Sequence, residues 1–216
     1  MSNYPEARVP GIELVPVKKL DLTQVVQTAE QLHRLTNSPN TIAELRRRGR
    51  QGTIRRYSGS VIDAVENLEV LQEQSKLKAF VVRSEIGSVI GMATIQKDLP
   101  LYEPNLPFLP AALERKLGLS EPVRTPDYNV SGWVDAQSRV ELGSEVVLRE
   151  VYKELRRMAP DSWTIEPMAA GHDTHHAIMN ADFMPVDGSV RFDELETAWY
   201  PPVSQLYLGR TAVISS

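Results

Sequence analysis

The chain contains no cysteine, and this absence excludes several classes of chemistry before any motif is considered. Without thiols there is no disulfide, no thiolate nucleophile and no sulfur ligand for zinc or an iron–sulfur cluster. The sequence also lacks a run of about 18 apolar residues, the length that crosses a bilayer, and residues 1–10 lack the apolar core of a signal peptide. We therefore expect a soluble, cytoplasmic protein with no membrane partner.

Neither sign of charge dominates the composition. The 216 residues include 24 Lys and Arg against 28 Asp and Glu, a net charge of -4. This balance gives no general attraction to polyanions, so nucleic acid is not an expected partner. Hydrophobic residues make up 42% of the chain, an ordinary value for a globular protein. A chain of this length supports one domain, over residues 1–216, with a sizeable core.

Proline is concentrated in one part of the chain. Six of the 15 prolines stand at positions 100, 104, 107, 110, 122 and 126. The residues between them include Leu101, Leu106, Phe108 and Leu109, which are too apolar to remain in water. We expect an ordered, proline-rich insertion at about 99–127 rather than a linker.

Two hydrophobic periods alternate along the chain. A period of about 3.6 predicts helices, whereas β-rich runs bounded by turn residues predict strands. The predicted helices occupy residues 21–37, 41–50, 60–75, 143–158 and 172–180. The predicted strands occupy residues 12–17, 78–83, 89–96, 128–135, 162–168, 183–191 and 195–212. This order predicts a mixed α/β sandwich in which helices cover both faces of one sheet.

Three phrases of the sequence carry a resemblance to a known family. They are the hairpin at 80–93, the strand-to-helix unit at 130–158, and the phrase Asn-Ala-Asp-Phe-Met-Pro-Val at 180–186. Together they resemble the GNAT acetyltransferase superfamily over residues 12–212. The resemblance implies an α/β, GNAT-like fold with a mixed, mostly antiparallel central sheet flanked by helices on both faces.

The resemblance also implies a reaction and a co-substrate, namely transfer from acetyl-CoA to a small amine or peptide amine. The backbone of residues 130–135 would align the pantetheine arm, and the turn 139–144 would receive the pyrophosphate at a helix N-terminus. The cofactor-binding residues implied in this way are Trp133, Val134, Arg139, Gly143 and Ser144. The Trp133 side chain itself fits the core better than a ligand contact. Direct attack of the amine on the thioester needs no cysteine.

Three side chains are the candidates for catalysis. Asp135 and Glu166 each end a predicted strand, where a carboxylate would deprotonate an incoming ammonium, directly or through water. A cap for the following loop at Asp135 and a solvated carboxylate at Glu166 are the structural alternatives. His172, or its neighbour His175, would act as acid or base, because imidazole titrates near neutral pH.

The same histidines permit a different function. His172 and His176 stand four residues apart and would share one helix face, as two ligands of a divalent metal do, with Asp173 or Glu166 as the carboxylate. The Glu of a His-Glu-x-x-His motif is absent, so structural or capping roles are favoured over metal. A metal-dependent hydrolase is therefore the third hypothesis, and we expect no metal.

Two departures from the family pattern keep a second hypothesis open. The family loop reads Q/R-x-x-G-x-G/A, whereas Glu141 occupies the position of a glycine if Gly143 is the last one. Many members also carry a tyrosine about five residues before the phenylalanine that corresponds to Phe183, and here that position is Ile178. The alternative is a non-catalytic GNAT-like binding or regulatory module that has lost acetyl-CoA binding, as a possible homodimer.

A basic stretch precedes these elements. Six arginines stand at positions 46, 47, 48, 50, 55 and 56. Three interpretations remain open: a contact to phosphate or nucleic acid, a wall for an acidic substrate, or a solvated face paired with the acidic helix at 63–73. Nucleic acid is the weakest of these, because the patch is short and has no interleaved aromatic residues.

Overall fold

A computed structural model describes residues 11–97, 127–185, 190–191 and 203–209 of the chain. The predicted proline-rich insertion at about 99–127 therefore lies outside the described residues, except for Asp127. No helix in the described part is both long and apolar enough to cross a membrane.

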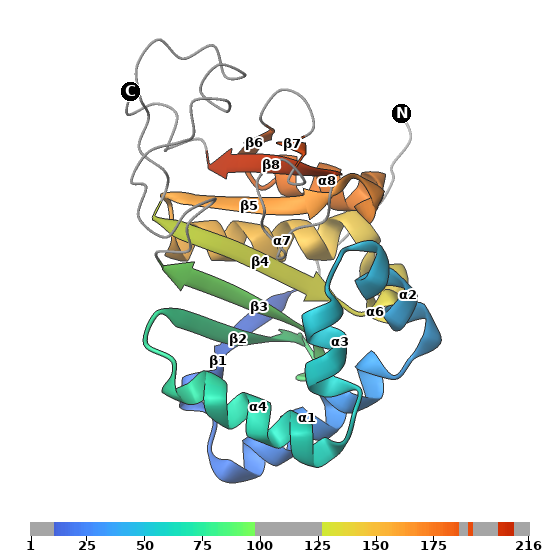
Figure 1. The fold of residues 1–216 in the computed structure, drawn as a ribbon, viewed down its shortest axis with the longest axis vertical. Coiled ribbons are helices and arrows are strands. Elements are labelled where there is room, and N and C mark those ends of the chain that lie inside the picture. The colour runs from blue at the N-terminus through green and yellow to red at the C-terminus, as the bar shows by residue number, and fades with distance from the viewer. Residues whose placement is uncertain (1–10, 98–126, 186–189, 192–202, 210–216) are drawn as a thin grey trace, which may run out of the picture.

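The strands form one mixed sheet (Figure 1). They are β1 (Ile12–Pro16), β2 (Leu77–Ser84), β3 (Val89–Lys97), β4 (Tyr128–Val134), β5 (Ser162–Pro167), β6 (Phe183–Pro185), β7 (Val190–Arg191) and β8 (Val203–Gly209). Their order is β1-β2-β3-β4-β5-β8-β6, with β7 paired to β8 outside this path. Only the pairing of β4 with β5 is parallel among the described strands. The sheet is thus mixed and mostly antiparallel, as the sequence predicts.

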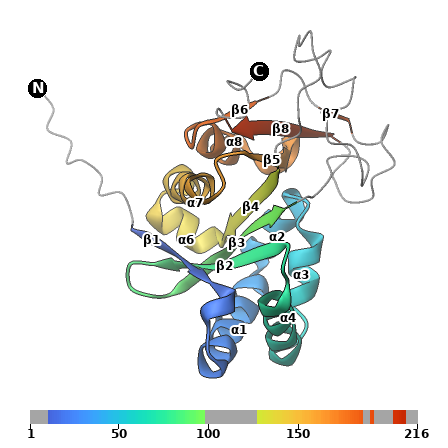
Figure 2. The same cartoon turned by 90° about the vertical axis from the view of Figure 1, so that its left-hand side faces the viewer.

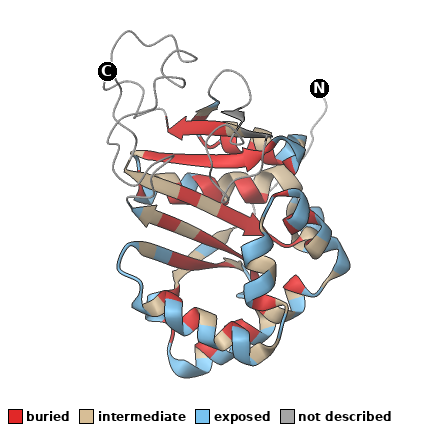
Figure 3. Cartoon of the chain, in the orientation of Figure 1, coloured by how far each residue is buried: buried red, intermediate tan, exposed pale blue. Residues whose placement is uncertain are grey.

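Helices cover both faces of this sheet (Figure 2). They are α1 (Leu22–Thr36), α2 (Pro39–Arg47), α3 (Gln51–Tyr57), α4 (Val61–Glu73), α6 (Ala136–Leu142), α7 (Ser144–Met158) and α8 (His172–Met179), with short 3-10 turns at Val17–Lys19 and Met168–Ala170. Residues of α1 and α4 share a core with Val81 and Met92, whereas α7 and α8 share another with Phe80 and Val82. Alternate residues of one strand face opposite cores, which is the period-two pattern of a sheet buried on both sides. Figure 3 shows β5 buried along its whole length.

One predicted turn is a helix instead. The segment expected to be a polar loop over 139–144 is α6 up to Leu142, followed by Gly143 at a φ of 86° and then α7. The physical cause is Asp135, whose Oδ1 accepts hydrogen bonds from the backbone N–H groups of Gln137 at 3.0 Å and Ser138 at 3.1 Å. This N-cap satisfies donors that a first helical turn leaves free, and so stabilises a helix in polar sequence.

The predicted basic helix at 41–50 is also corrected. The helix α2 ends at Arg47, and a further helix that the sequence did not predict, α3, begins at Gln51, with Gly49 between them at a φ of 66° in the left-handed region. Glycine adopts this conformation without steric cost. The turn brings Arg48 and Arg50, on either side of Gly49, to the same buried carboxylate.

The C-terminal strands agree with the prediction at every residue that the structure describes in the two predicted ranges. The run expected over 183–191 is described as β6 and β7, and the run expected over 195–212 as β8. Residues 186–189, 192–202 and 210–216, where the rest of these predictions falls, lie outside the described residues.

Candidate functional site

The strands β4 and β5 part from each other soon after they begin. They pair at Tyr128 with Ser162 and at Asn129 with Trp163, and no further along their length. Beyond these positions β4 continues to pair with β3, and β5 with β8. Figure 1 shows the two strands diverging toward their C-terminal ends, beside α2, α3 and α6. Divergence leaves backbone groups of β4 without a neighbouring strand.

An arginine from α2 enters this divergence. Arg48 caps the C-terminus of α2, and its side chain has no exposed surface. Its Nη2 donates to the carbonyl oxygen of Gly132 on β4 at 2.8 Å, and to Glu166 Oε1 on β5 at 2.5 Å. Its Nε donates to Glu166 Oε2 at 3.1 Å. Arg48 thus bridges the two strands where their own hydrogen-bond ladder has stopped.

Two more side chains converge on Glu166. Arg50 Nη2 donates to Glu166 Oε1 at 2.6 Å, and the Tyr152 hydroxyl, from α7, donates to the same oxygen at 2.9 Å. We call Arg48, Arg50, Tyr152 and Glu166 the Glu166 cluster. The exposed fraction of the Glu166 side chain is 0%, so the cluster is shielded from water at its centre.

The cluster fixes the charge of its members. Burial by itself raises the pKa of Glu166, but Arg48 and Arg50 more than offset burial and lower that pKa to about 2. Burial and the neighbouring Glu166 raise the pKa of Tyr152 to about 12, so its hydroxyl remains a donor. A general base works best with a pKa near the operating pH. Glu166 is ionised and already fully engaged, and its geometry does not suit the predicted role of base.

Asp135 has the better geometry for that role. It is buried at the end of β4, and its Oδ1 caps α6. Its Oδ2 is also buried and has no hydrogen-bond partner. A buried carboxylate oxygen without a partner is energetically costly, and it is the kind of group that a substrate proton would satisfy. The structural alternative expected for Asp135, a cap, is present alongside this free oxygen.

The residues predicted for the pyrophosphate lie together at the start of α7. Arg139 Nη2 donates to Ser144 Oγ at 2.7 Å and to Thr174 Oγ1 at 3.3 Å. Its Nη1 binds Glu44, whose other carboxylate oxygen binds Arg47. Burial lowers the pKa of Arg139, and Glu44 opposes this effect. The guanidinium thus lies at the first turns of α7 and α8.

The N-terminus of α7 carries no side-chain cap. Its N-cap residue is Gly143, which has no side chain to accept from the first-turn N–H groups. Such uncapped N–H groups, together with the helix dipole, favour an anion.

The two predicted strand residues, Trp133 and Val134, are both buried in the cores on opposite faces of the sheet. Any contact they make to a cofactor is through backbone.

The histidines of α8 do not form a metal site in the described part of the chain. His172 is exposed at the first position of α8, and its ring lies against that of His176 with centroids 3.7 Å apart. No group of three or more His, Cys, Asp or Glu side chains suited to a metal occurs among the described residues. His175 instead hydrogen-bonds through Nδ1 to the Tyr207 hydroxyl, whose pKa is raised by burial and by Glu166.

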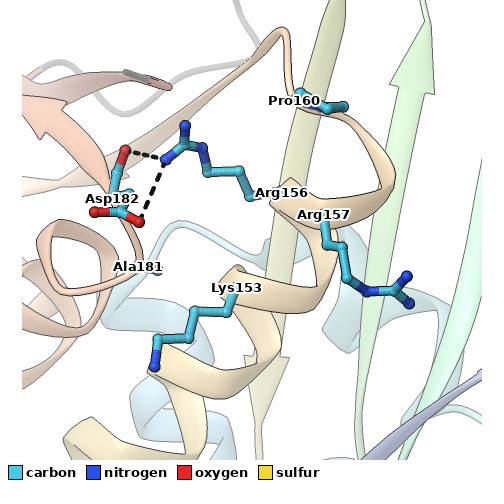
Figure 4. A pocket seen from close by; sticks show the side chains of 6 residues that line it. All are labelled: Lys153, Arg156, Arg157, Pro160, Ala181 and Asp182. Carbon is cyan, nitrogen blue, oxygen red and sulfur yellow. Dashed lines mark hydrogen bonds and ion pairs between the residues drawn. The ribbon is translucent and has the colours of Figure 1, made fainter. Parts of the chain in front are cut away.

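A separate hollow lies at the C-terminal end of α7 (Figure 4). It is lined by Lys153, Arg156, Arg157, Pro160, Ala181 and Asp182. Its cations have partners: Lys153 pairs with Glu150, Arg157 with Glu154, and Arg156 donates to the carbonyl oxygen of Asp182 at 2.5 Å. Each of its cations thus already has a partner within the described residues.

Sequence reasoning missed most partners of Glu166. Tyr152 flanks the apolar stripe of a helix, and nothing in its neighbours marks it as a partner of a carboxylate. Arg48 and Arg50 belong to a run of six arginines, in which only the intervening Gly49 sets these two apart. Glu44 and Thr174, which bind Arg139, likewise carry no local signal.

No protein-family model matches the sequence, and no curated protein matches it. Several solved structures resemble it. The spermidine N-acetyltransferase from Vibrio cholerae in complex with CoA and spermine gives a TM-score of 0.57 at 10% identity, covering 94% of this chain and 98% of that chain. The Microcin C7 self immunity acetyltransferase in complex with acetyl-CoA and AMP gives 0.53 at 11%, covering 84% and 86%. A probable GNAT-family acetyltransferase from Chromobacterium violaceum gives 0.51 at 12%, covering 95% and 92%.

These likenesses extend over nearly the whole of each chain and agree with the architecture. The structural likeness shows the fold. Identities near one residue in ten leave the reaction open. The hairpin of β2 and β3 and the unit from β4 to α7, which carry two of the three phrases of the sequence resemblance, are both present in the structure. The chain therefore has the fold of the GNAT acetyltransferase superfamily.

Proposed function

We propose that the protein is an acyl-CoA-dependent N-acyltransferase that acetylates a small amine or a peptide amine. One observation carries the proposal: β4 diverges from β5 and leads, through Asp135 and the short helix α6, to α7, whose N-terminus has no side-chain cap. This arrangement supplies backbone groups for an extended thioester arm and N–H groups for a diphosphate. Two of the similar solved structures support it, since they are acetyltransferases in complex with acetyl-CoA or CoA.

The residues present fit acetyl-CoA once two arginines, Arg139 and Arg48, exchange their present partners. The first turn of α7, with Ser144 and Arg139, suits the diphosphate, provided that Arg139 exchanges Glu44 for the phosphate oxygens. The carbonyl of Gly132 is occupied by Arg48, which must release it before a pantetheine arm can lie along β4. When bound, acetyl-CoA supplies the activated acetyl group.

Asp135 prepares the acceptor in this proposal. Its free Oδ2 accepts a proton from the ammonium, so that a neutral amine is present to attack the thioester carbonyl. The new N–C bond forms as the C–S bond breaks, and the leaving thiolate takes up the proton that the attacking nitrogen loses. Arg48 and Arg50 hold Glu166 as a fixed anion and take no part in the proton transfer.

Replacing Asp135 by asparagine tests this role. Asparagine caps a helix about as well as aspartate, so α6 and the stability of the protein are retained. We expect kcat to fall by a factor on the order of 100 to 10,000, the usual contribution of a general base, with acetyl-CoA binding unchanged. The matched control is Asp21→Asn, at the exposed N-cap of α1, which should leave kcat unchanged. Equal activity of wild type and Asp135→Asn across an amine panel would remove Asp135 from the mechanism.

A second candidate function is favoured by Arg48. Its side chain lies wholly buried in the divergence of β4 and β5, where the pantetheine arm would lie. On this ground the alternative is a non-catalytic module of GNAT fold that does not bind acetyl-CoA; the possible homodimer remains a prediction from sequence.

Thermal unfolding with acetyl-CoA and with CoA distinguishes the transferase from the non-catalytic module. A ligand at 100 times its Kd stabilises by about 2.7 kcal/mol, so a saturable shift supports the transferase and no shift at millimolar concentration supports the module.

A further inference from the structure

The Glu166 cluster carries more positive than negative charge. Two guanidinium groups, of Arg48 and Arg50, share the single carboxylate of Glu166. Tyr152 adds no charge, because its pKa is raised to about 12. Arg48 and Glu166 have no exposed side-chain surface and pair with each other, so the excess positive charge belongs to the partly exposed Arg50. The cluster is therefore one negative charge short of neutrality.

The cluster also has unused hydrogen-bond donors. Arg48 Nη1 and Arg50 Nε are buried and have no hydrogen-bond partner. The carboxylate cannot satisfy them, because Glu166 Oε1 already accepts from Arg48, Arg50 and Tyr152, and Oε2 accepts from Arg48. Buried donors of this kind are nearly always paired in native proteins. The Glu166 cluster thus lacks both a negative charge and hydrogen-bond acceptors for these two N–H groups.

Solvent reaches the Glu166 cluster at Arg50. Its side chain is 22% exposed, whereas that of Arg48 is fully buried, so Arg50 is the arginine of the cluster that solvent reaches. Arg46 and Arg47, on the neighbouring turn of α2, are exposed. Glu44, the only acidic residue of α2 and α3, is already bound by Arg47 and Arg139. A cationic ligand would be repelled here, and an anion attracted.

We propose that the Glu166 cluster binds the carboxylate of an acceptor that carries both an amine and a carboxylate, such as a short peptide. This inference rests on the proposed function and specifies its substrate class. A carboxylate fits better than a phosphate, because one negative charge neutralises the cluster and two would leave it negative. A carboxylate also accepts two N–H bonds at once from guanidinium groups.

The test compares two ligands that differ only in the charged group. Glycylglycine and glycylglycine amide share the same amine, and only the first has a carboxylate. Both are titrated, without acetyl-CoA, into ¹⁵N-labelled protein, and the arginine side-chain Nε–H signals are followed. We expect the Arg50 signal to shift with glycylglycine, with a Kd at least tenfold lower than for the amide.

Two variants locate the effect. Arg50→Gln removes one guanidinium and should abolish the preference for glycylglycine, whereas Arg55→Gln, at an exposed arginine of α3, should retain it. Equal binding of acid and amide by the wild type overturns the inference, as does an equal loss in the two variants or tighter binding of inorganic phosphate. If Arg50→Gln does not fold, the comparison of acid with amide in the wild type still decides.

The outcome is separable from that of the proposed function. If acetyl-CoA does not bind but glycylglycine is preferred in an Arg50-dependent way, the carboxylate site stands and acyl transfer fails. If acetyl-CoA binds and both ligands are acetylated with similar kcat/KM, acyl transfer stands and the carboxylate site fails.

Discussion

Replacing Glu166 by glutamine is expected to lower the free energy of unfolding by about 3 to 5 kcal/mol, the usual cost of removing one partner of a buried ion pair. The variant leaves Arg48 buried with full charge beside a neutral amide, and it also weakens the bonds from Arg50 and Tyr152. Urea unfolding at pH 7, monitored by circular dichroism, measures the change.

A double variant provides the control. Combining Glu166→Gln with Arg48→Met removes the stranded charge, so the pair of changes should destabilise by less than the sum of the two single changes. A loss below about 1 kcal/mol for Glu166→Gln would show that the cluster is not the stabilising centre inferred from its burial.

The pH dependence of stability provides an independent measurement. The pKa of Glu166 is lowered from 4.5 to about 2 in the folded protein, so the unfolded chain takes up a proton first as the pH falls. The contribution of Glu166 is complete above about pH 5 and is lost as the pH falls toward 2, by an amount on the order of 3 kcal/mol. The difference in stability between wild type and Glu166→Gln should therefore shrink over this range. A difference that stays constant from pH 6 to pH 3 would contradict the lowered pKa.

Replacing Gly91 by alanine is the second change with a large expected effect. A Cβ at this position would lie 2.0 Å from the carbonyl oxygen of Trp133 and 2.9 Å from Val134 Cα, both of them backbone atoms. Gly91 pairs with Val134 in the β3–β4 ladder, so relief of the clash must move the end of β4. We expect a loss of about 3 kcal/mol, at the upper end of overpacking effects, measured by urea unfolding.

Gly52 offers the matched control for this change. It lies in α3 with nothing within 4 Å of an added Cβ. Gly52→Ala should stabilise the protein by about 0.5 to 1 kcal/mol, because alanine loses less conformational entropy than glycine in a helix. Similar small effects of both substitutions would mean that β3 and β4 separate more easily than their register indicates.

The fold was predictable because its signals are local. The hairpin of β2 and β3 follows from two β-rich runs around a glycine-containing turn, and α7 follows from an apolar stripe at helical spacing. Both appear in the structure close to their predicted limits. The helix α6 was not predictable from such a stripe, since it has seven residues and its stability depends on the cap at Asp135.

The candidate site was predictable only in part. Asp135 was identified because it ends a strand, and this position does place its carboxylate at the divergence of β4 and β5. Glu166 was identified because it also ends a strand, but its oxygens accept hydrogen bonds from arginines that lie far from it in the sequence. Arg48 lies 118 positions away in sequence, and Arg50 lies 116 positions away.

The sequence by itself determined which segments are helices and strands and in what order they follow, because hydrophobic period, caps and glycine turns act over a few residues. Only the tertiary structure decided which charges meet. The free energy of an ion pair depends on burial and on distances between atoms from separate elements, and neither quantity is encoded in local spacing. Gly49 illustrates the division: its position in a basic run is plain in the sequence, whereas its effect, bringing Arg48 and Arg50 to one buried carboxylate, exists only in the fold.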